Sequence, residues 1–526
     1  MIDRVATLWP EIILFATASI VMLLGLSPSN DTRRATTWIT GVGLFFAFVF
    51  SMRGPSLEVS LLPGLPDVVK PLTCLMGLLL LLGMGGIDAR LEREIDEGRT
   101  FDPLDTTRGE FLAFFLLSLI GLMLCTTATD LIWLFLALEL TSLPTYVMVA
   151  TSRPRASAGE AGVKYFFLGA LAAAIFLYGF ALLYGATGSL KLDEIRAALL
   201  AQSAADQVNL IAIVGALLAI IGVSFKIAAV PMHFYTADVY EGAASPVSAF
   251  LAFVPKTAGF IAIMGLMAPF LGLNQMAGEP WPAALHGALW LIAALTMTIG
   301  NTLAIMQSSA KRMLAYSSVA HSGYMLIGVI AGPSVGLAST NGFAAVVFYL
   351  FAYGVMNTGA FFALACLERD GEEVESIDDL RGVARRQPGV AAALAVCALS
   401  LLGLPPLIGF FGKLYLFAAG IAAGEYVLVV IAGLNSAVAA YYYLRLAGAP
   451  WIGRESKRGS PVEACPFTGR GVAIAIAGVG VVVLSLFANL LVTAGHRATR
   501  FDEVEIVAES SAMDDLDDQA RLDSDH

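Results

Sequence analysis

The sequence predicts an all-α, polytopic membrane protein with about fourteen transmembrane helices. Of its 526 residues, 58% are hydrophobic and only 14% are charged, whereas about a quarter of the residues of a soluble globular protein are charged. Apolar runs of about 18 residues or more recur along the whole chain. The runs do not alternate as barrel strands do, and open strands cannot span lipid, so we expect a bundle of helices.

The expected helices follow the apolar runs in chain order. The first run resembles a signal peptide, but Asp3 offsets Arg4 and no clear cleavage site follows, so we expect it to be retained. The expected helices are residues 9–27, 36–52, 69–87, 110–127, 129–150, 161–185, 208–230, 246–268, 283–307, 312–332, 341–367, 388–423, 426–446 and 470–494.

The basic residues indicate how the chain crosses the membrane. Nineteen Lys and Arg residues lie in or beside the loops after the odd-numbered helices, and four lie in or beside the alternate loops. Positive residues favour the cytoplasmic side, so the sequence predicts both termini outside, on the periplasmic side of a bacterial inner membrane. The four residues of the alternate loops are Arg53, Lys70, Lys191 and Arg196.

Five ionisable residues fall within or at the edge of apolar segments. They are Glu139, Lys164, Lys226, Lys256 and Lys413. An ionisable group at membrane depth is costly and usually faces the interior of the bundle, so several in one chain indicate a charge pathway. Each has a simpler alternative: a lysine near a helix end, above all Lys164, can extend to the headgroups, and Glu139 can be a protonated structural acid.

Prolines predict breaks beside two of these lysines. A continuous helix over 388–423 would be roughly 54 Å long, against roughly 30 Å of hydrocarbon, and Pro405-Pro406 would break it near Lys413. Pro231 is expected to break the seventh helix soon after Lys226. Broken helices at membrane depth line wet cavities. We therefore expect Glu139 to pair with a buried lysine, Lys226, and to modulate its proton.

Histidine and tyrosine add polar groups to the apolar segments. His233 follows Lys226 by seven residues, and His321 lies in AYSSVAHSGYMLIG; both are candidates for proton relay, with hydrogen-bonded packing as the alternative. The run Tyr441 to Tyr443 is typical of an aromatic belt at the membrane interface.

Several classes of site are absent from the sequence. Its five cysteines are scattered, and it contains no Cys/His cluster, HExxH motif, Walker A loop or GxGxxG fingerprint, so we expect no metal or cofactor in this chain. No basic nucleic-acid face is present either. The net charge of -11 is concentrated in the tail, residues 496–526, which is acidic, lacks an apolar stripe and is expected to be disordered.

The pattern of breaks suggests an internal duplication. Helices 4–8 and 9–13 form two groups of five, and the fourth helix of each group, helix 7 or helix 12, has a lysine and a proline break. Because five is odd, the two groups would insert with opposite topology, as inverted repeats do. The expected regions are 1–109 (helices 1–3), 110–268 (first repeat), 283–446 (second repeat), 447–495 (a cytoplasmic loop and helix 14) and 496–526 (tail).

Five stretches carry a resemblance to a known family. They are LALELTSLPTYVMVA, KYFFLGALAAAIFLYGFALLYGATGSL, FKIAAVPMHFYTADVYEGAASPVSAFLAFVPKTAGF, KRMLAYSSVAHSGYMLIG and GLPPLIGFFGKLYLF. Together they resemble the antiporter-like membrane subunits of respiratory complex I, the proton-pumping NADH–quinone oxidoreductase, and most closely those of the N type.

The resemblance implies a proton-translocating role and assigns residues to it. Glu139, Lys226 and Lys256 match the family's fifth-, seventh- and eighth-helix residues, and Lys413 matches the lysine of the twelfth helix. His233 and Lys164 fall on positions that are polar in the N type. It also implies that NAD(H), FMN, iron–sulfur clusters and quinone reside in partner subunits. Those partners would be other membrane and peripheral subunits of complex I, including neighbouring antiporter-like subunits, all assembled in a lipid bilayer.

Two other functions remain open from the sequence. The chain could belong to a multi-subunit cation/proton antiporter of the sodium/proton type, or it could be a membrane scaffold. Five ionisable residues in apolar segments argue against the scaffold. Partner chains that bind NADH and quinone would favour complex I over the antiporter.

Overall fold

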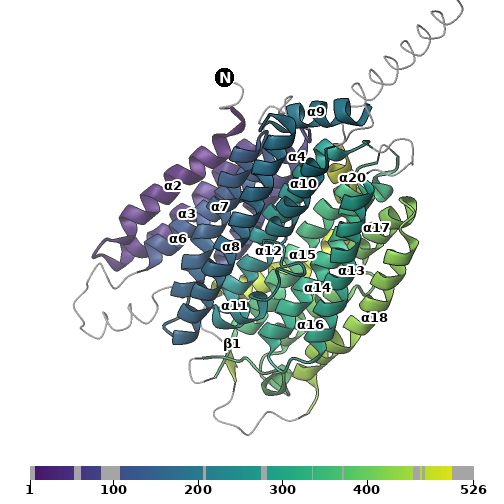
Figure 1. The fold of residues 1–526 in the computed structure, drawn as a ribbon. Coiled ribbons are helices and arrows are strands. Elements are labelled where there is room, and N and C mark those ends of the chain that lie inside the picture. The colour runs from purple at the N-terminus through teal and green to yellow at the C-terminus, as the bar shows by residue number, and fades with distance from the viewer. Residues whose placement is uncertain are drawn as a thin grey trace, which may run out of the picture.

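The structure is a computed structural model, and it describes residues 6–52, 61–84, 107–204, 209–273, 281–334, 336–369, 372–453, 462–464 and 468–499. Most of these residues are helical, which confirms the predicted all-α class (Figure 1). The α-helices are α2 (Trp9–Gly25), α3 (Asn30–Ser51), α4 (Leu65–Gly83), α6 (Arg108–Thr126), α7 (Leu131–Thr151), α8 (Ala156–Thr187), α9 (Leu192–Ala204), α10 (Leu210–Val223), α11 (Thr236–Gly242), α12 (Ser245–Met267), α13 (Ala283–Ile305), α14 (Ala310–Ala331), α15 (Gly342–Ala365), α16 (Pro388–Leu402), α17 (Ile408–Ala422), α18 (Tyr426–Gly448), α19 (Thr468–Leu486) and α20 (Ala488–Ala498).

Each of the fourteen predicted segments contains helix. Within the described ranges, eleven helices are long and apolar enough to cross a membrane by length and composition. The shorter apolar helices are α2, α10, α16 and α17, and the last three belong to segments that the structure shows to be broken. The number of membrane crossings therefore stays a prediction, because it depends on how the broken segments are counted.

Three predicted helices are divided in two. The break between α16 and α17 contains Pro405-Pro406, as predicted. The segment 208–230 differs from its prediction, since α10 ends at Val223, before Lys226, and helix resumes only at Thr236 in α11. The last segment was predicted as one helix, but it turns at Phe487, so that α20 packs against α15 and α4.

The structure also contains elements that apolar runs could not reveal. Helix α9 lies across one end of the bundle, and β1 marks the opposite end (Figure 1). In the first turn of α9, hydrogen bonds from Lys191 and Ser189 lower the pKa of Glu194 and keep it charged.

The strands β1 (Leu367–Arg369), β2 (Glu372–Glu373) and β3 (Glu463–Ala464) form an antiparallel sheet in the order β2-β1-β3. The short 3-10 helices are η1 (Ala268–Phe270), η3 (Ala338–Thr340), η4 (Ile377–Leu380), η5 (Val383–Arg385) and η6 (Ala449–Trp451).

The core of the bundle consists of α12, α14 and α15, which are almost completely buried. The surrounding helices expose large apolar side chains, such as Phe45, Phe167, Leu291 and Val430. A soluble protein rarely exposes so continuous an apolar surface, whereas a bilayer requires one. Helices without lipid contact can hold polar side chains, and two residues of the candidate site, Lys256 and His321, lie on these three.

Two further predictions can be compared with the described residues. Cys74, Cys125, Cys366 and Cys397 are buried, as expected of small apolar residues, whereas Cys465 lies outside the described residues. The predicted tail begins too early, because α20 extends to Ala498; its hydrogen bond from Asn341 to His496 ties the last turn to the bundle. Residues 500–526 lie outside the described residues.

Glu11 and Lys70 form a buried ion pair between α2 and α4. Lys70 Nζ lies 2.8 Å from Glu11 Oε1 and donates to the carbonyl of Thr7 at 2.6 Å. The sequence placed Lys70 beside a loop and Glu11 at the start of the first helix, yet both are buried. The reason is mutual: each charge compensates the other.

We expect Lys70→Met to destabilise the protein, because Glu11 would keep its burial and lose its cation. Removing one partner of a buried pair costs about 3–5 kcal/mol. The thermal unfolding midpoint of the purified protein in detergent measures the effect. The double variant Glu11→Gln/Lys70→Met should recover most of the stability, and an unchanged midpoint in Lys70→Met would contradict the prediction.

Candidate functional site

The interrupted segment between α10 and α11 places Lys226 inside the bundle. Residues 224–235 form successive turns, and Lys226 is buried. Ala228 has a φ of 56°, a left-handed conformation that non-glycine residues rarely adopt and that a helix cannot contain. A strained backbone of this kind persists only when its surroundings hold it.

Side chains from neighbouring elements hold the backbone of this segment. Unpaired backbone groups are costly at membrane depth, and here hydroxyl groups satisfy them. The bonds are from Tyr235 Oη to the carbonyl of Phe225 (2.7 Å), from the N–H of Val230 to Thr296 Oγ1 (3.0 Å), and from Ser322 Oγ to the carbonyl of Ile227. The helix therefore ends early because α13 and α14 compensate for the lost helical bonds.

Glycine at position 259 brings α12 against this segment. A Cβ at Gly259 would lie 2.9 Å from the Cβ of Lys226 and 2.7 Å from a side-chain carbon of Ile227. Any larger residue would push α12 away. The close contact places Lys256, one turn earlier on α12, near the segment that carries Lys226.

Glu139 and Lys226 are in contact, as the sequence predicted. Lys226 Nζ lies 3.3 Å from Glu139 Oε1 and also donates to Ser142 Oγ, one turn further along α7. The two partners differ in exposure: the side chain of Lys226 is 1% exposed and that of Glu139 is 19% exposed. Glu139 thus lies between the buried ammonium group of Lys226 and the outer face of α7. The exposed apolar residues of that face are Ile132, Leu136, Leu143 and Val147.

Lys256 occupies a different environment. Its Nζ donates to the carbonyl oxygen of Ser318 at 2.5 Å and contacts Ser318 Oγ at 2.6 Å, and it lies 4.8 Å from the centre of the Tyr353 ring. Among the described residues, no carboxylate lies within salt-bridge distance of Lys256. Its ammonium form is therefore stabilised only by neutral groups and by the face of a ring.

His321 lies between two phenols. Its Nδ1 and the hydroxyl of Tyr349 are 2.7 Å apart, and its Nε2 and the hydroxyl of Tyr443 are also 2.7 Å apart. A neutral imidazole donates from one nitrogen and accepts at the other, and a phenol can take either role, so the arrangement suits both tautomers. Ser317 extends the network through its hydrogen bond with Tyr443.

Lys413 lies at the second break, as predicted. Its Nζ donates to the carbonyl of Leu402 at 2.7 Å and to Ser436 Oγ at 2.9 Å. Leu402 is the last residue of α16, so its carbonyl belongs to the negative end of that helix dipole. Gly403 follows with a φ of 92°, and a Cβ there would lie 3.1 Å from Cδ of Lys413.

Tyr324 connects His321 with Lys413. Its ring centre is 5.7 Å from that of His321 and 5.2 Å from Lys413 Nζ. Its hydroxyl accepts a hydrogen bond from Asn301 Nδ2 at 3.0 Å. We call Glu139, Lys226, Lys256, His321 and Lys413 the polar row; apart from Glu139, its members are buried inside the bundle.

The predicted aromatic belt is wrong for two of its three residues. Tyr441 is 61% exposed, but Tyr442 and Tyr443 are buried, bonded to Asn301 and to His321 respectively. Consecutive residues of a helix point about 100° apart, so one tyrosine can face outward while the next two face α13 and α14.

Two candidates lie apart from the polar row. The side chain of Lys164 is 43% exposed and binds Glu160 at 2.7 Å and Asp238 at 3.0 Å. It lines a polar surface cavity of about 260 Å³. His233 is buried, its ring centre lies 4.6 Å from that of Phe234, and its Nδ1 has no hydrogen-bond partner among the described residues.

Besides Lys70, sequence reasoning missed one more buried lysine outside the row. Lys311 was counted among the loop residues, but it is completely buried and donates to the carbonyl of Ala243 at 2.5 Å. Its Nζ lies 3.7 Å from Glu373, which also binds Arg153. The sequence did contain one sign of this burial. Lys311 and Ser318 are seven residues apart, so they lie on the same face of one helix.

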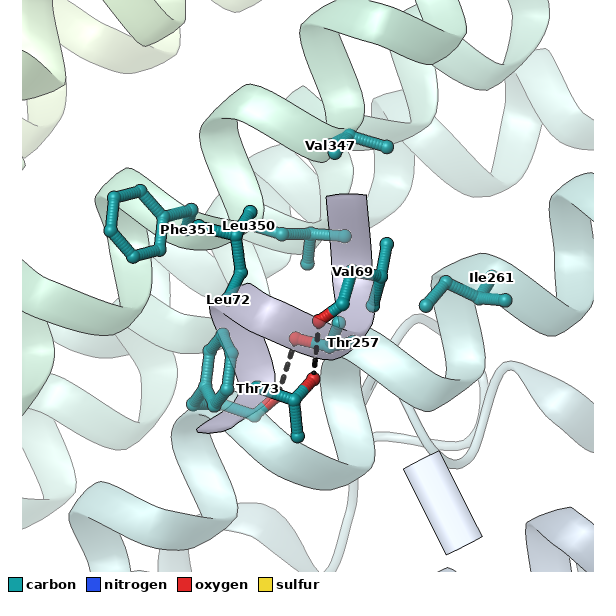
Figure 2. Close-up of a pocket in the computed structure, with 9 residues that line it drawn as sticks. Val69, Leu72, Thr73, Thr257, Ile261, Val347, Leu350 and Phe351 are labelled. Carbon is teal, nitrogen blue, oxygen red and sulfur yellow. Dashed lines mark hydrogen bonds between the residues drawn. The ribbon is translucent and has the colours of Figure 1, made fainter. Parts of the chain in front are cut away.

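An apolar groove between α4, α12 and α15 is separate from the polar row (Figure 2). Its two hydroxyl groups bond within their own helices, from Thr73 to the carbonyl of Val69 at 2.8 Å and from Thr257 to the carbonyl of Phe253 at 2.7 Å. The groove therefore offers no free polar group. In the described part of the chain, no cluster of three or more His, Cys, Asp or Glu residues could hold a metal ion.

Comparison with known proteins adds names to this geometry. Residues 128–439 match the family described as "NADH:quinone oxidoreductase/Mrp antiporter, TM". The chain is 36% identical to NADH-quinone oxidoreductase subunit N of Trichlorobacter lovleyi, over 83% of this chain and 85% of that one. It is 36% identical to the protein of the same name from Rhodospirillum rubrum, over 93% and 95%.

Solved structures share the fold. A chain of respiratory complex I from Thermus thermophilus with bound aureothin has a TM-score of 0.73 and 32% identity, covering 92% of this chain and 98% of that one. The Mrp complex from Dietzia gives a TM-score of 0.73 over 96% and 98% at 19% identity, a likeness of fold alone. These relatives come from multi-subunit membrane assemblies.

Proposed function

Because the chain belongs to the family of the N subunits of NADH-quinone oxidoreductase, we propose that it is the proton-translocating membrane subunit of such a complex. The family resemblance inferred from the sequence is thereby confirmed. The redox reaction belongs to the enzyme as a whole. In this proposal NAD(H), FMN, iron–sulfur clusters and quinone are held by partner subunits, which include neighbouring antiporter-like subunits.

The polar row is the observation that supports proton translocation most strongly. It places lysines and a histidine in the interior of an otherwise apolar bundle. Such residues are retained at membrane depth where they carry charge. Protonating one member of the row disfavours protonation of its neighbours, because charges interact strongly at low dielectric. A proton can therefore move along the row when the next group comes to bind it more strongly than the group that holds it.

Glu139 and Lys226 set the first step of this mechanism. When they are in contact, the carboxylate favours the protonated lysine; when they separate, Lys226 loses that support and releases a proton toward Lys256. Lys256, His321 and Lys413 then act in turn, linked by Ser318 and the tyrosines. Lys164 and His233, outside the row, would serve proton uptake at the polar cavity and beside Lys226.

Two inverted five-helix repeats, 110–268 and 283–446, are part of the proposal. The breaks between α10 and α11 and between α16 and α17 support it, since each places a lysine beside interrupted backbone. In transporters built from such repeats, substrate sites lie near the middle of the membrane. The remaining regions, 1–109, 447–495 and 496–526, lie outside both repeats.

The distribution of basic residues supports an orientation in the bacterial inner membrane. The end of the bundle that carries β1 and the loop with Arg381, Arg385 and Arg386 would be cytoplasmic. Both termini and α9 would then lie on the periplasmic side.

The proposed function can be tested with the intact complex. A tagged chain, purified from membranes, should bring with it NADH–quinone oxidoreductase activity, and vesicles containing the complex should build a pH gradient when NADH and quinone are added. The alternative is a subunit of a cation/proton antiporter. It would be favoured if no NADH-oxidising activity co-purified and an imposed sodium gradient drove proton movement without NADH.

We expect Glu139→Gln to reduce proton pumping several-fold, because glutamine keeps the shape of the side chain and removes the charge that holds Lys226. Glu139→Asp should restore part of the pumping, since it keeps the charge at a longer distance. Glu194→Gln, the same change at an exposed carboxylate of α9, is the control. Pumping by Glu139→Gln equal to that of the Glu194 control would show that Glu139 is a structural acid.

A further inference from the structure

Helix α15 carries buried polar side-chain atoms without a hydrogen-bond partner among the described residues. Tyr353 Oη, both side-chain heteroatoms of Asn357, and Thr358 Oγ1 are buried and have no hydrogen-bond partner among the described residues. Asn357 and Thr358 are completely buried. Asn357 lies one helical turn beyond Tyr353, so the two face the same way. Tyr353 and Asn357 therefore form a cluster and are not isolated defects, whereas Thr358 points about 100° away from Asn357.

An amide in this position requires a ligand. A buried polar group left without a partner costs about 1–3 kcal/mol, and Asn357 offers two donors and an acceptor. Buried water satisfies such groups when two to four polar partners surround it. Tyr353 supplies a further partner, so the chemistry of the cluster fits water.

The position of the cluster relates it to Lys256. The ring of Tyr353 lies 4.8 Å from Lys256 Nζ, and Asn357 follows Tyr353 toward the end of α15 that leads into β1. One turn further, the ring centre of Phe361 is 5.9 Å from that of Tyr240 on α11. At the same end of the bundle, Lys311 precedes Ser318 on α14 by seven residues, or roughly 10 Å.

We propose that Asn357, with Tyr353, binds water molecules through which Lys256 exchanges protons with the end of the bundle that holds Lys311 and Glu373. The proposal rests on the proposed proton-translocating function and adds a site to it. Asn357 is a positioning residue: it orients the water and does not itself titrate. The site gives Lys256, which has no carboxylate partner among the described residues, a second route for proton exchange besides the one from Lys226.

The test uses the whole complex in vesicles and compares proton pumping per NADH oxidised. Asn357→Leu, nearly equal in volume, should assemble with little change in thermal stability, because the amide and the water that it binds are replaced by an apolar side chain of similar shape. Its pumping should fall on the order of tenfold or more, since a positioned proton transfer contributes at least that much. Asn357→Thr, which keeps a polar group, should recover part of the loss.

The matched control is Thr257→Val on α12. Its hydroxyl also is buried and lies next to Lys256, but it bonds to its own helix and lines the apolar groove, so pumping should equal that of the wild type. A high-resolution electron-microscopy map of the complex should show water density within hydrogen-bond distance of Asn357.

Each result has a defined meaning. Wild-type pumping by Asn357→Leu overturns the water site, as does a map without density at Asn357, or a loss in Thr257→Val as large as that in Asn357→Leu. Lys256→Met separates the site from the function on which it rests. If Lys256→Met pumps normally, the proposed pathway fails; if it does not pump while Asn357→Leu does, only the water site fails.

Discussion

Replacing Lys226 by alanine should leave the complex assembled and reduce its proton pumping by at least about tenfold, because the group that first accepts the proton is gone. Assembly should survive because the partner, Glu139, is 19% exposed and is therefore not enclosed inside this chain without its cation. Membrane vesicles assayed in parallel for NADH oxidation and for the pH gradient measure the effect.

Two further variants make the Lys226 experiment specific. Lys226→Met keeps the bulk of the stem against Gly259 and α12, so a loss of pumping in this variant reflects the missing ammonium group and not a cavity. Lys191→Ala removes an exposed lysine in a salt bridge with Glu194 and should pump as the wild type does. Wild-type pumping by both Lys226 variants would remove Lys226 from the pathway.

At Lys413 the expected order of pumping is Lys, then Arg, then Met, with Met close to no pumping. Arginine keeps a positive charge near the carbonyl of Leu402, but it effectively cannot be deprotonated, so it cannot pass a proton on. Methionine keeps much of the stem and removes the charge. The same vesicle assay applies, with complex assembly measured by co-purification.

The geometry around Lys413 indicates which result would contradict a role in proton transfer. Gly403 leaves little room beside the lysine, since a Cβ there would lie 3.1 Å from its Cδ. If methionine pumped as well as lysine while arginine prevented assembly, volume would matter at this position and titration would not. Lys413 would then be a packing residue at the end of α16.

Local chemistry made the main features of the site predictable from the sequence. Prolines 405 and 406 cannot continue a helix, and a lone carboxylate in an apolar run requires a cation, so the second break and the contact between Glu139 and Lys226 could be inferred. Fourteen apolar segments were likewise visible. Each of these inferences rested on residues close together in the chain, or on one charge that required a partner.

Features that depend on remote partners could not be read from the chain. Helix α10 ends before Lys226 because Thr296 and Ser322, far along the sequence, bond to its freed backbone. Lys311 looked like a loop residue until α11 and Glu373 were seen to cover it. Helix α9 and the small sheet lack long apolar runs, so hydropathy gave no sign of them.

The burial of α14 has a consequence for the synthesis of the protein. A ribosome delivers this helix to the translocon before α15 exists, yet its sequence contains Lys311, Arg312 and His321 among several serines. A lysine or arginine at the centre of a helix opposes insertion by about 2.5–3.5 kcal/mol, and by less toward its ends. Alone in lipid, α14 would have no groups to receive these side chains. We therefore expect it to remain beside the translocon, paired with α13, until α15 arrives and supplies Tyr349 and the rest of its polar surroundings.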